Sequence, residues 1–105
     1  MRFTTLALAG LAACGNNAPV QESYATLDAC YMDHTDPAGE GLTPAHAITV
    51  CCFEHPIGTP PVANKVCGDT AAACNTYVTA QLSAEGIAAA DITAACTDYI
   101  SQRGM

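Results

Sequence analysis

Cysteine content is the feature that most constrains this chain. Seven cysteines occur in 105 residues, a length that forms one small domain. Much of the apolar content is alanine and cysteine, and tryptophan is absent, so the hydrophobic core must be small. Small cores commonly need covalent cross-links, and dense cysteine usage is typical of exported proteins in an oxidising compartment. The sequence therefore predicts an exported domain held together by disulfides.

The N-terminus has the layout of a secretory signal peptide. One basic residue precedes a short apolar run that ends in small residues. The end of that run, Leu11–Cys14 (LAAC), resembles the lipobox of bacterial lipoproteins. The resemblance implies that residues 1–13 are removed, that Cys14 is acylated, and that the protein is anchored in the bacterial cell envelope. Because Gly15 rather than aspartate follows Cys14, it also implies the outer membrane if the source is Gram-negative.

The cysteine count supports this interpretation. With Cys14 assigned to the lipid, six cysteines are left, and six can pair as three disulfides. Residues 14–21 then form the lipidated cysteine and a polar tether, and residues 22–105 form a cysteine-rich domain. The mature chain has ten acidic residues against Lys65 and Arg103, a balance that excludes nucleic acid as a partner. We therefore expect contact with the membrane only through the lipid on Cys14.

Apolar residues at spacings of three and four predict helices throughout the domain. Thr43 before Pro44 is a typical helix start, and Asp69 or Thr70 precedes the third stretch. No segment alternates apolar and polar residues as a half-buried strand does. The expected fold is all-α, a small disulfide-stapled bundle of about four short helices. They cover about Glu22–Met32, Pro44 to the residue before Pro56, Ala71–Leu82 and Ala89–Gln102.

Turn positions suggest which cysteines pair. Residues equidistant from a turn lie at the same height on two antiparallel helices. We place the turns near Gly41 and near Glu85. The expected pairs are Cys30–Cys52, Cys51–Cys67 and Cys74–Cys96. Because Cys51 and Cys52 are neighbours, an exchange between the first two pairs stays open.

Three histidines are weak candidates for a metal site, namely His34, His46 and His55. Asp33, Asp36 and Glu40 lie near the first of them in sequence, and imidazole with carboxylate suits zinc or copper. Against this, His46 and His55 are nine residues apart, which is not the four-residue spacing that places two ligands on one helix face. The alternative is that all of these are exposed helix-end and loop groups.

The neighbouring Cys51 and Cys52 allow a second chemistry. A disulfide between adjacent cysteines is strained and easily reduced, so the pair could be a redox switch. The alternative is that each cysteine forms a structural bridge to a different partner. The chain has no C-x-x-C motif to support a thioredoxin-like dithiol.

The segment between the second and third helices is a candidate contact surface for a protein partner. It is rich in proline and glycine, and proline-rich segments lose little conformational entropy on binding. Its alternative role is a plain connector held by Cys67. The predicted contact residues are Ile57, Pro60, Pro61 and Val62.

Motifs for catalysis are missing. The chain has neither a G-x-S-x-G elbow nor a glycine-rich phosphate loop, so we expect no enzyme and no cofactor. The function predicted first is a membrane-anchored, non-catalytic binding or structural module with an envelope protein as partner. The alternatives are a metal- or small-ligand-binding envelope protein that uses the three histidines, and a thiol-redox protein centred on Cys51 and Cys52.

Overall fold

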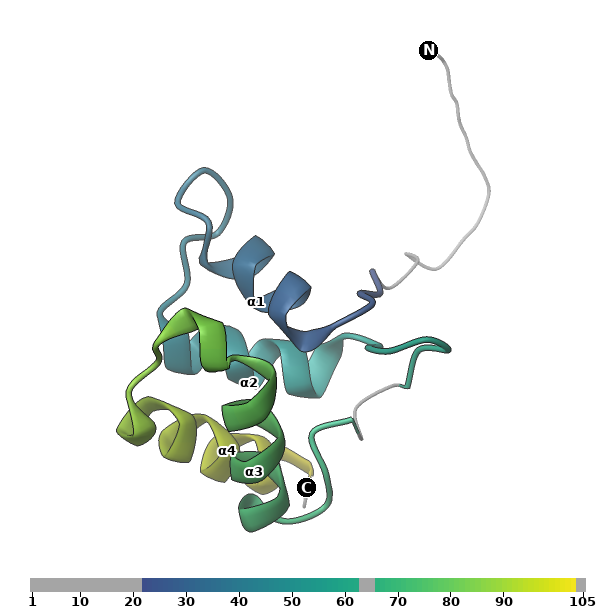
Figure 1. Ribbon diagram of the computed structural model, residues 1–105, viewed down its shortest axis with the longest axis vertical. Helices are drawn as coiled ribbons and strands as arrows, with labels where there is room; N and C mark the ends of the chain where they lie inside the picture. Colours follow the sequence, from purple (N-terminus) through teal and green to yellow (C-terminus); the bar gives the residue numbers. More distant parts are fainter. Residues whose placement is uncertain (1–21, 63–65, 104–105) are drawn as a thin grey trace.

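The computed structural model describes residues 22–62 and 66–103, and these residues form an all-α domain (Figure 1). The predicted signal peptide, Cys14 and the tether lie outside the described residues. The fold class predicted from the sequence is confirmed. The helices are α1 (Leu27–Thr35), α2 (Pro44–Glu54), α3 (Ala71–Gln81) and α4 (Ala89–Arg103), with a short 3₁₀ turn, η1 (Ser83–Glu85), between the last two.

Three helices begin at a threonine whose hydroxyl accepts a hydrogen bond from a backbone N–H of the first turn. Thr43 caps α2, with Pro44 as its first residue, as predicted. Thr70, rather than Asp69, caps α3. Thr26 caps α1, so the prediction of a start at Glu22 is wrong. The described residues before Thr26 are not helical, because the backbone of Tyr24 exchanges hydrogen bonds with Pro56 and Gly58.

Helix α2 is the centre of the molecule. It packs most extensively on α4 and also on α1, and α3 packs on α4. Figure 1 shows α2 across the middle, with α1 above it and α4 below it in that view. The buried side chains form one cluster along these contacts. Its larger members are Leu27, Tyr31, Ile48, Ile57, Val78, Leu82, Ile92 and Tyr99, together with six fully buried cysteines.

The six cysteines of the described residues form three disulfides. The predicted pair Cys74–Cys96 is confirmed. The predicted pairs Cys30–Cys52 and Cys51–Cys67 are wrong, since Cys30 bonds Cys51 and Cys52 bonds Cys67. Successive residues on a helix point about 100° apart. Cys51 and Cys52 therefore face different directions, Cys51 toward α1 and Cys52 toward the segment before α3. The predicted pairing was wrong by one residue along α2.

The loop after α2 folds back onto the core. Ile57 and Val62 exchange two backbone hydrogen bonds, and Ile57 also forms a bridge with Tyr24. The side chain of Ile57 is only 1% exposed, so its prediction as a partner-contact residue is wrong. Pro60, Pro61 and Val62 are exposed. The search for alternating apolar and polar residues did not predict these contacts, because they are isolated β-bridges and not a strand.

No helix within residues 22–62 and 66–103 is long and apolar enough to span a membrane.

Asp28 and Glu85 bring two carboxyl groups together where α1 meets η1. A hydrogen bond with Asp28 raises the pKa of the Glu85 carboxyl above its usual value, and slight burial and the charge of Asp28 act in the same direction. A raised carboxyl pKa means that the folded state holds the proton more tightly than the unfolded state. The contact is therefore favourable in acid and is lost as pH rises through the raised pKa.

We expect Glu85→Gln to raise the melting temperature at pH 7, because the amide keeps a donor for Asp28 without a second negative charge. At pH 3, where the carboxyl of Glu85 in the wild type is protonated, the two proteins should have the same melting temperature. Thermal unfolding followed by circular dichroism at both pH values checks this. A pH-independent difference would show that the carboxyl pair is not its cause.

We expect the double variant Cys74→Ser/Cys96→Ser to lower the free energy of unfolding by about 3 kcal/mol. The bond closes a loop with a sequence separation of 22. Without it, the unfolded chain gains conformational entropy, which lowers the free energy of unfolding by this amount. Urea unfolding measures the change, after mass spectrometry has verified the other two disulfides. An unaltered midpoint would mean that the bond contributes nothing to stability.

Candidate metal centre

His34 is placed by α1 and by the disulfide beneath it. It follows Cys30 by four residues, so both side chains lie on the helix face that meets α2. The side chain of His34 is almost fully buried. Its Nδ1 lies 2.9 Å from the carbonyl oxygen of Cys30. A carbonyl oxygen can only accept a hydrogen bond, so Nδ1 of His34 carries a proton.

His55 is placed by the end of α2. It is the residue at which the helix ends, and its backbone is extended because Pro56 follows. Its Nδ1 lies 2.9 Å from the carbonyl oxygen of Glu22, so this nitrogen carries a proton as well. The segment that contains Glu22 is held alongside by the backbone hydrogen bonds of Tyr24. Both imidazoles are thus fixed through Nδ1 by a backbone carbonyl.

The two remaining ring nitrogens face each other. Nε2 of His34 and Nε2 of His55 are 3.1 Å apart, and the ring centroids are 4.7 Å apart. In a neutral imidazole with a proton on Nδ1, Nε2 bears a lone pair. Two lone pairs at this distance repel each other unless a cation lies between them. That cation is either one shared proton or one metal ion.

Glu40 places a carboxylate beside His34. Its Oε1 is 3.5 Å from Nε2 of His34. The loop between α1 and α2 positions it, because the N–H groups of Gly39 and Gly41 both donate to the carbonyl of Asp36. Gly41 has a φ of 61°, a conformation that favours glycine. Leu42 closes the loop by donating its N–H to the carbonyl of His34.

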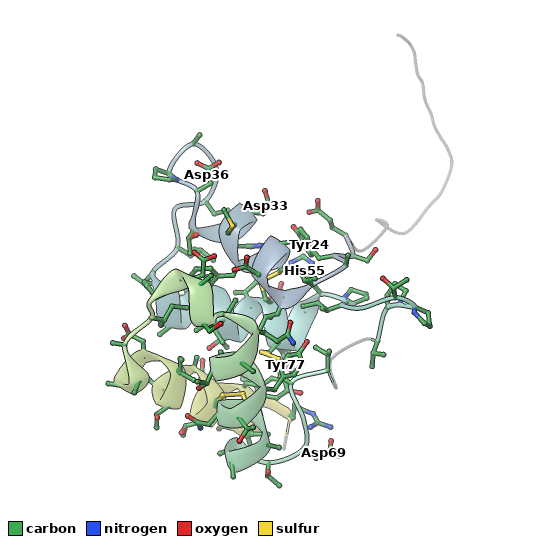
Figure 2. The ribbon with its side chains drawn as sticks, viewed as in Figure 1. Tyr24, Asp33, Asp36, His55, Asp69 and Tyr77 are labelled. Atoms are coloured by element: carbon green, nitrogen blue, oxygen red, sulfur yellow. A yellow bond between two sulfur atoms is a disulfide. The ribbon has the colours of Figure 1, made fainter. Side chains whose placement is uncertain are left out.

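Tyr24 covers the histidine pair without offering a ligand. Its ring meets His34 and His55 edge-on, with centroids 6.0 and 5.4 Å away. Its hydroxyl donates to Oδ2 of Asp33 at 2.6 Å. Figure 2 shows Tyr24 beside His55, with Asp33 further along α1. Burial and the hydrogen bonds to Asp33 and Glu22 raise the pKa of Tyr24 far above its usual value, so the phenol stays protonated.

The histidine pair lines an open hollow of about 510 Å³. Its wall includes four acidic side chains and three histidines, and no lysine or arginine of residues 22–62 and 66–103 lines it. Such a wall attracts cations and repels anions. The charged and titratable lining residues are Glu22, Asp33, Glu40, Glu54, His34, His46 and His55.

The geometry suits a divalent transition metal. Zinc binds imidazole nitrogen at about 2.0–2.1 Å, so two tetrahedral nitrogen ligands are about 3.3 Å apart. The observed separation of 3.1 Å between the Nε2 atoms is close to that value. Metal-binding histidines generally donate their other N–H to a carbonyl or carboxylate, which both Nδ1 atoms do. His34 and His55 thus offer two nitrogen ligands, and the carboxylate of Glu40 lies 3.5 Å from the first of them.

Cys30 belongs to the same cluster. The candidate ligand atoms of Cys30, His34 and His55 all lie within 4.8 Å of one another. In the disulfide with Cys51, the Cys30 sulfur is not a thiolate and is a poor ligand. Cys51 and Cys52 bond to different partners, which is the structural alternative to a redox-active bond between these neighbours.

The structure brings together only part of the predicted histidine set. His34 and His55 touch, whereas His46 is exposed on the wall of the hollow, in the first turn of α2. Asp36 is a turn residue whose Oδ1 accepts from the N–H of Ala38. The roles of Tyr24 and Cys30 were missed. The four-residue spacing of Cys30 and His34 was the signal that could have revealed the latter.

Comparison of the chain with models of protein families, with curated protein sequences and with solved structures gives no match.

The two fixed histidines predict a specific NMR signature. In metal-free protein, Nδ1 of both His34 and His55 should carry a proton, because both Nδ1 atoms donate to carbonyls, and the two Nε2 atoms should share at most one proton. Long-range ¹H–¹⁵N correlation spectra identify the tautomer, and the exposed ring of His46 serves as an internal reference. Protons found on both Nε2 atoms would contradict the proposed hydrogen bonds.

Proposed function

We propose that this protein is a non-catalytic metal-binding module. It holds one divalent transition-metal ion, such as Zn²⁺ or Cu²⁺, through Nε2 of His34, Nε2 of His55 and the carboxylate of Glu40. The observation that carries the proposal is the 3.1 Å approach of two Nε2 atoms whose partner nitrogens both donate to backbone carbonyls. A proton bridges such a pair with one hydrogen bond, whereas a metal ion makes a bond to each nitrogen and adds Glu40.

The surroundings of the pair support a cation. Four carboxylates line the hollow, and the nearest of them is already 3.5 Å from a ligand nitrogen. Imidazole nitrogen with carboxylate oxygen suits zinc, copper and nickel better than calcium or magnesium, which prefer oxygen alone. Three protein ligands leave a fourth position open toward the hollow.

We further propose that the module is anchored in the bacterial cell envelope through a lipid on Cys14. The LAAC motif supports this, and so does the cysteine count, because three disulfides use the other six cysteines. The metal-binding proposal takes up the first alternative predicted from the sequence, with His34 and His55 as ligands but without His46. An envelope protein that contacts the exposed Pro60, Pro61 and Val62 stays compatible with it.

Metal titration of the protein with its three disulfides verified by mass tests the proposal. Isothermal calorimetry with Zn²⁺ and Cu²⁺ should give one site per chain. His55→Ala should weaken binding by more than about 100-fold, since it removes a direct ligand, and Glu40→Gln by about tenfold. His46→Ala is the matched control, because it removes a histidine of the same hollow and should leave the affinity close to that of the wild type.

Two outcomes would overturn the proposal. One is a wild-type protein that binds neither ion, which would leave a shared proton as the sole cation between the histidines. The other is an affinity that depends on His46 as strongly as on His55. Circular dichroism of each variant separates loss of a ligand from loss of the fold.

A further inference from the structure

A second set of metal-binding groups lies directly beneath the first. Sγ of Cys30 is 3.6 Å from Nδ1 of His34, and Sγ of Cys51 is 3.9 Å from the same nitrogen. Both sulfurs are fully buried. The imidazole of His34 thus stands between two donor sets, with Nε2 toward Glu40 and His55 and Nδ1 toward the sulfurs.

The sulfur distances fit zinc geometry. Zinc binds thiolate sulfur at about 2.3 Å and imidazole nitrogen at about 2.0–2.1 Å, so a sulfur and a nitrogen on one tetrahedral zinc are about 3.6 Å apart. The two observed distances, 3.6 and 3.9 Å, are close to that value. A ring nitrogen of His55 lies within 4.8 Å of the Cys30 sulfur and of a ring nitrogen of His34. Two sulfurs and two imidazoles make the Cys₂His₂ set of structural zinc sites.

We infer that reduction of the Cys30–Cys51 disulfide opens a latent zinc site formed by Cys30, Cys51, His34 and His55. The inference extends the proposed function, because it uses the same two histidines, but it concerns the reduced protein. The disulfide then acts as a redox control on which ligands the metal meets. A thiol reductant would replace the site with nitrogen and oxygen ligands by a site in which two of the ligands are the sulfurs of Cys30 and Cys51.

The chemistry balances with a thiol as the reductant. One reductant thiolate attacks a sulfur of the Cys30–Cys51 bond, forms a mixed disulfide and releases the other cysteine. A second reductant thiol then attacks the reductant's sulfur in the mixed disulfide and releases the remaining cysteine. Two electrons pass to the protein sulfurs, two protons follow, and the reductant leaves as its own disulfide. Zn²⁺ then displaces one proton from each cysteine and binds both thiolates. His34 must release the Cys30 carbonyl, so that Nδ1 becomes the ligand atom.

The oxidised and reduced sites compete for one ion, because both need His34 and His55. Zinc therefore favours reduction only if it binds the reduced site more tightly than the oxidised one. We expect this, since two thiolates replace one carboxylate. With free zinc at ten times the dissociation constant of the reduced site, and far below that of the oxidised site, the ratio of reduced to oxidised Cys30–Cys51 should rise about tenfold.

The test is a redox titration of the full chain in glutathione buffers, with and without Zn²⁺. Differential alkylation and tandem mass spectrometry report each cysteine separately. Zinc should raise the reduced fraction of Cys30 and Cys51 and leave that of Cys74 and Cys96 unchanged, which makes the third disulfide an internal control. His55→Ala should abolish most of the zinc effect, and His46→Ala should retain it.

Cobalt gives an independent signature. Co²⁺ added to the reduced protein, after removal of the reductant, should produce thiolate-to-cobalt charge-transfer absorption that His55→Ala weakens. Co²⁺ on the oxidised protein should give none. An unchanged reduced fraction with zinc would overturn the inference, as would an equal rise at all six cysteines. Metal binding by the oxidised protein is measured separately, so failure of the proposed function gives a different result.

Discussion

The disulfide between Cys30 and Cys51 is the constraint on which the rest of the structure depends. It joins α1 to the central helix α2, and each of its sulfurs is fully buried. Because His34 follows Cys30 by one helical turn, the same bond sets where His34 meets the end of α2. The neighbouring bond from Cys52 to Cys67 then holds the segment that leads into α3. Two adjacent cysteines of α2 thus hold two different parts of the domain, Cys51 the helix α1 and Cys52 the segment before α3.

Three short segments converge on this bond and form the candidate site. The residues before α1 bring the Glu22 carbonyl, the loop after α1 brings Glu40, and the end of α2 brings His55. Backbone hydrogen bonds hold each segment, and the imidazoles of His34 and His55 are also fixed by hydrogen bonds of their own Nδ1 atoms. The two candidate ligand nitrogens are therefore already positioned. Preorganisation of this kind lets a domain with a small core bind a metal without refolding.

Local chemistry in the sequence was enough to predict that four helices form and where two of them begin. Thr43 with Pro44 predicted the start of α2, and Asp69 or Thr70 that of α3, where Thr70 is the cap. The start of α1 was predicted wrongly. Long-range contacts were not predictable in the same way. Tyr24 is extended because it pairs with residues more than 30 positions later, and the Cys30 partner depended on a rotation of 100° that residue counting does not resolve. His34 and His55 are 21 residues apart, so only the assembled fold brings them together.

The most direct test of the central claim is a crystal structure of the disulfide-bonded protein with zinc, with anomalous diffraction recorded at the zinc edge. We predict one anomalous peak per chain, about 2.0–2.1 Å from Nε2 of both His34 and His55 and within bonding distance of Glu40. A peak at His46 alone, or none at the pair while both Nδ1 atoms still donate to their carbonyls, would contradict it.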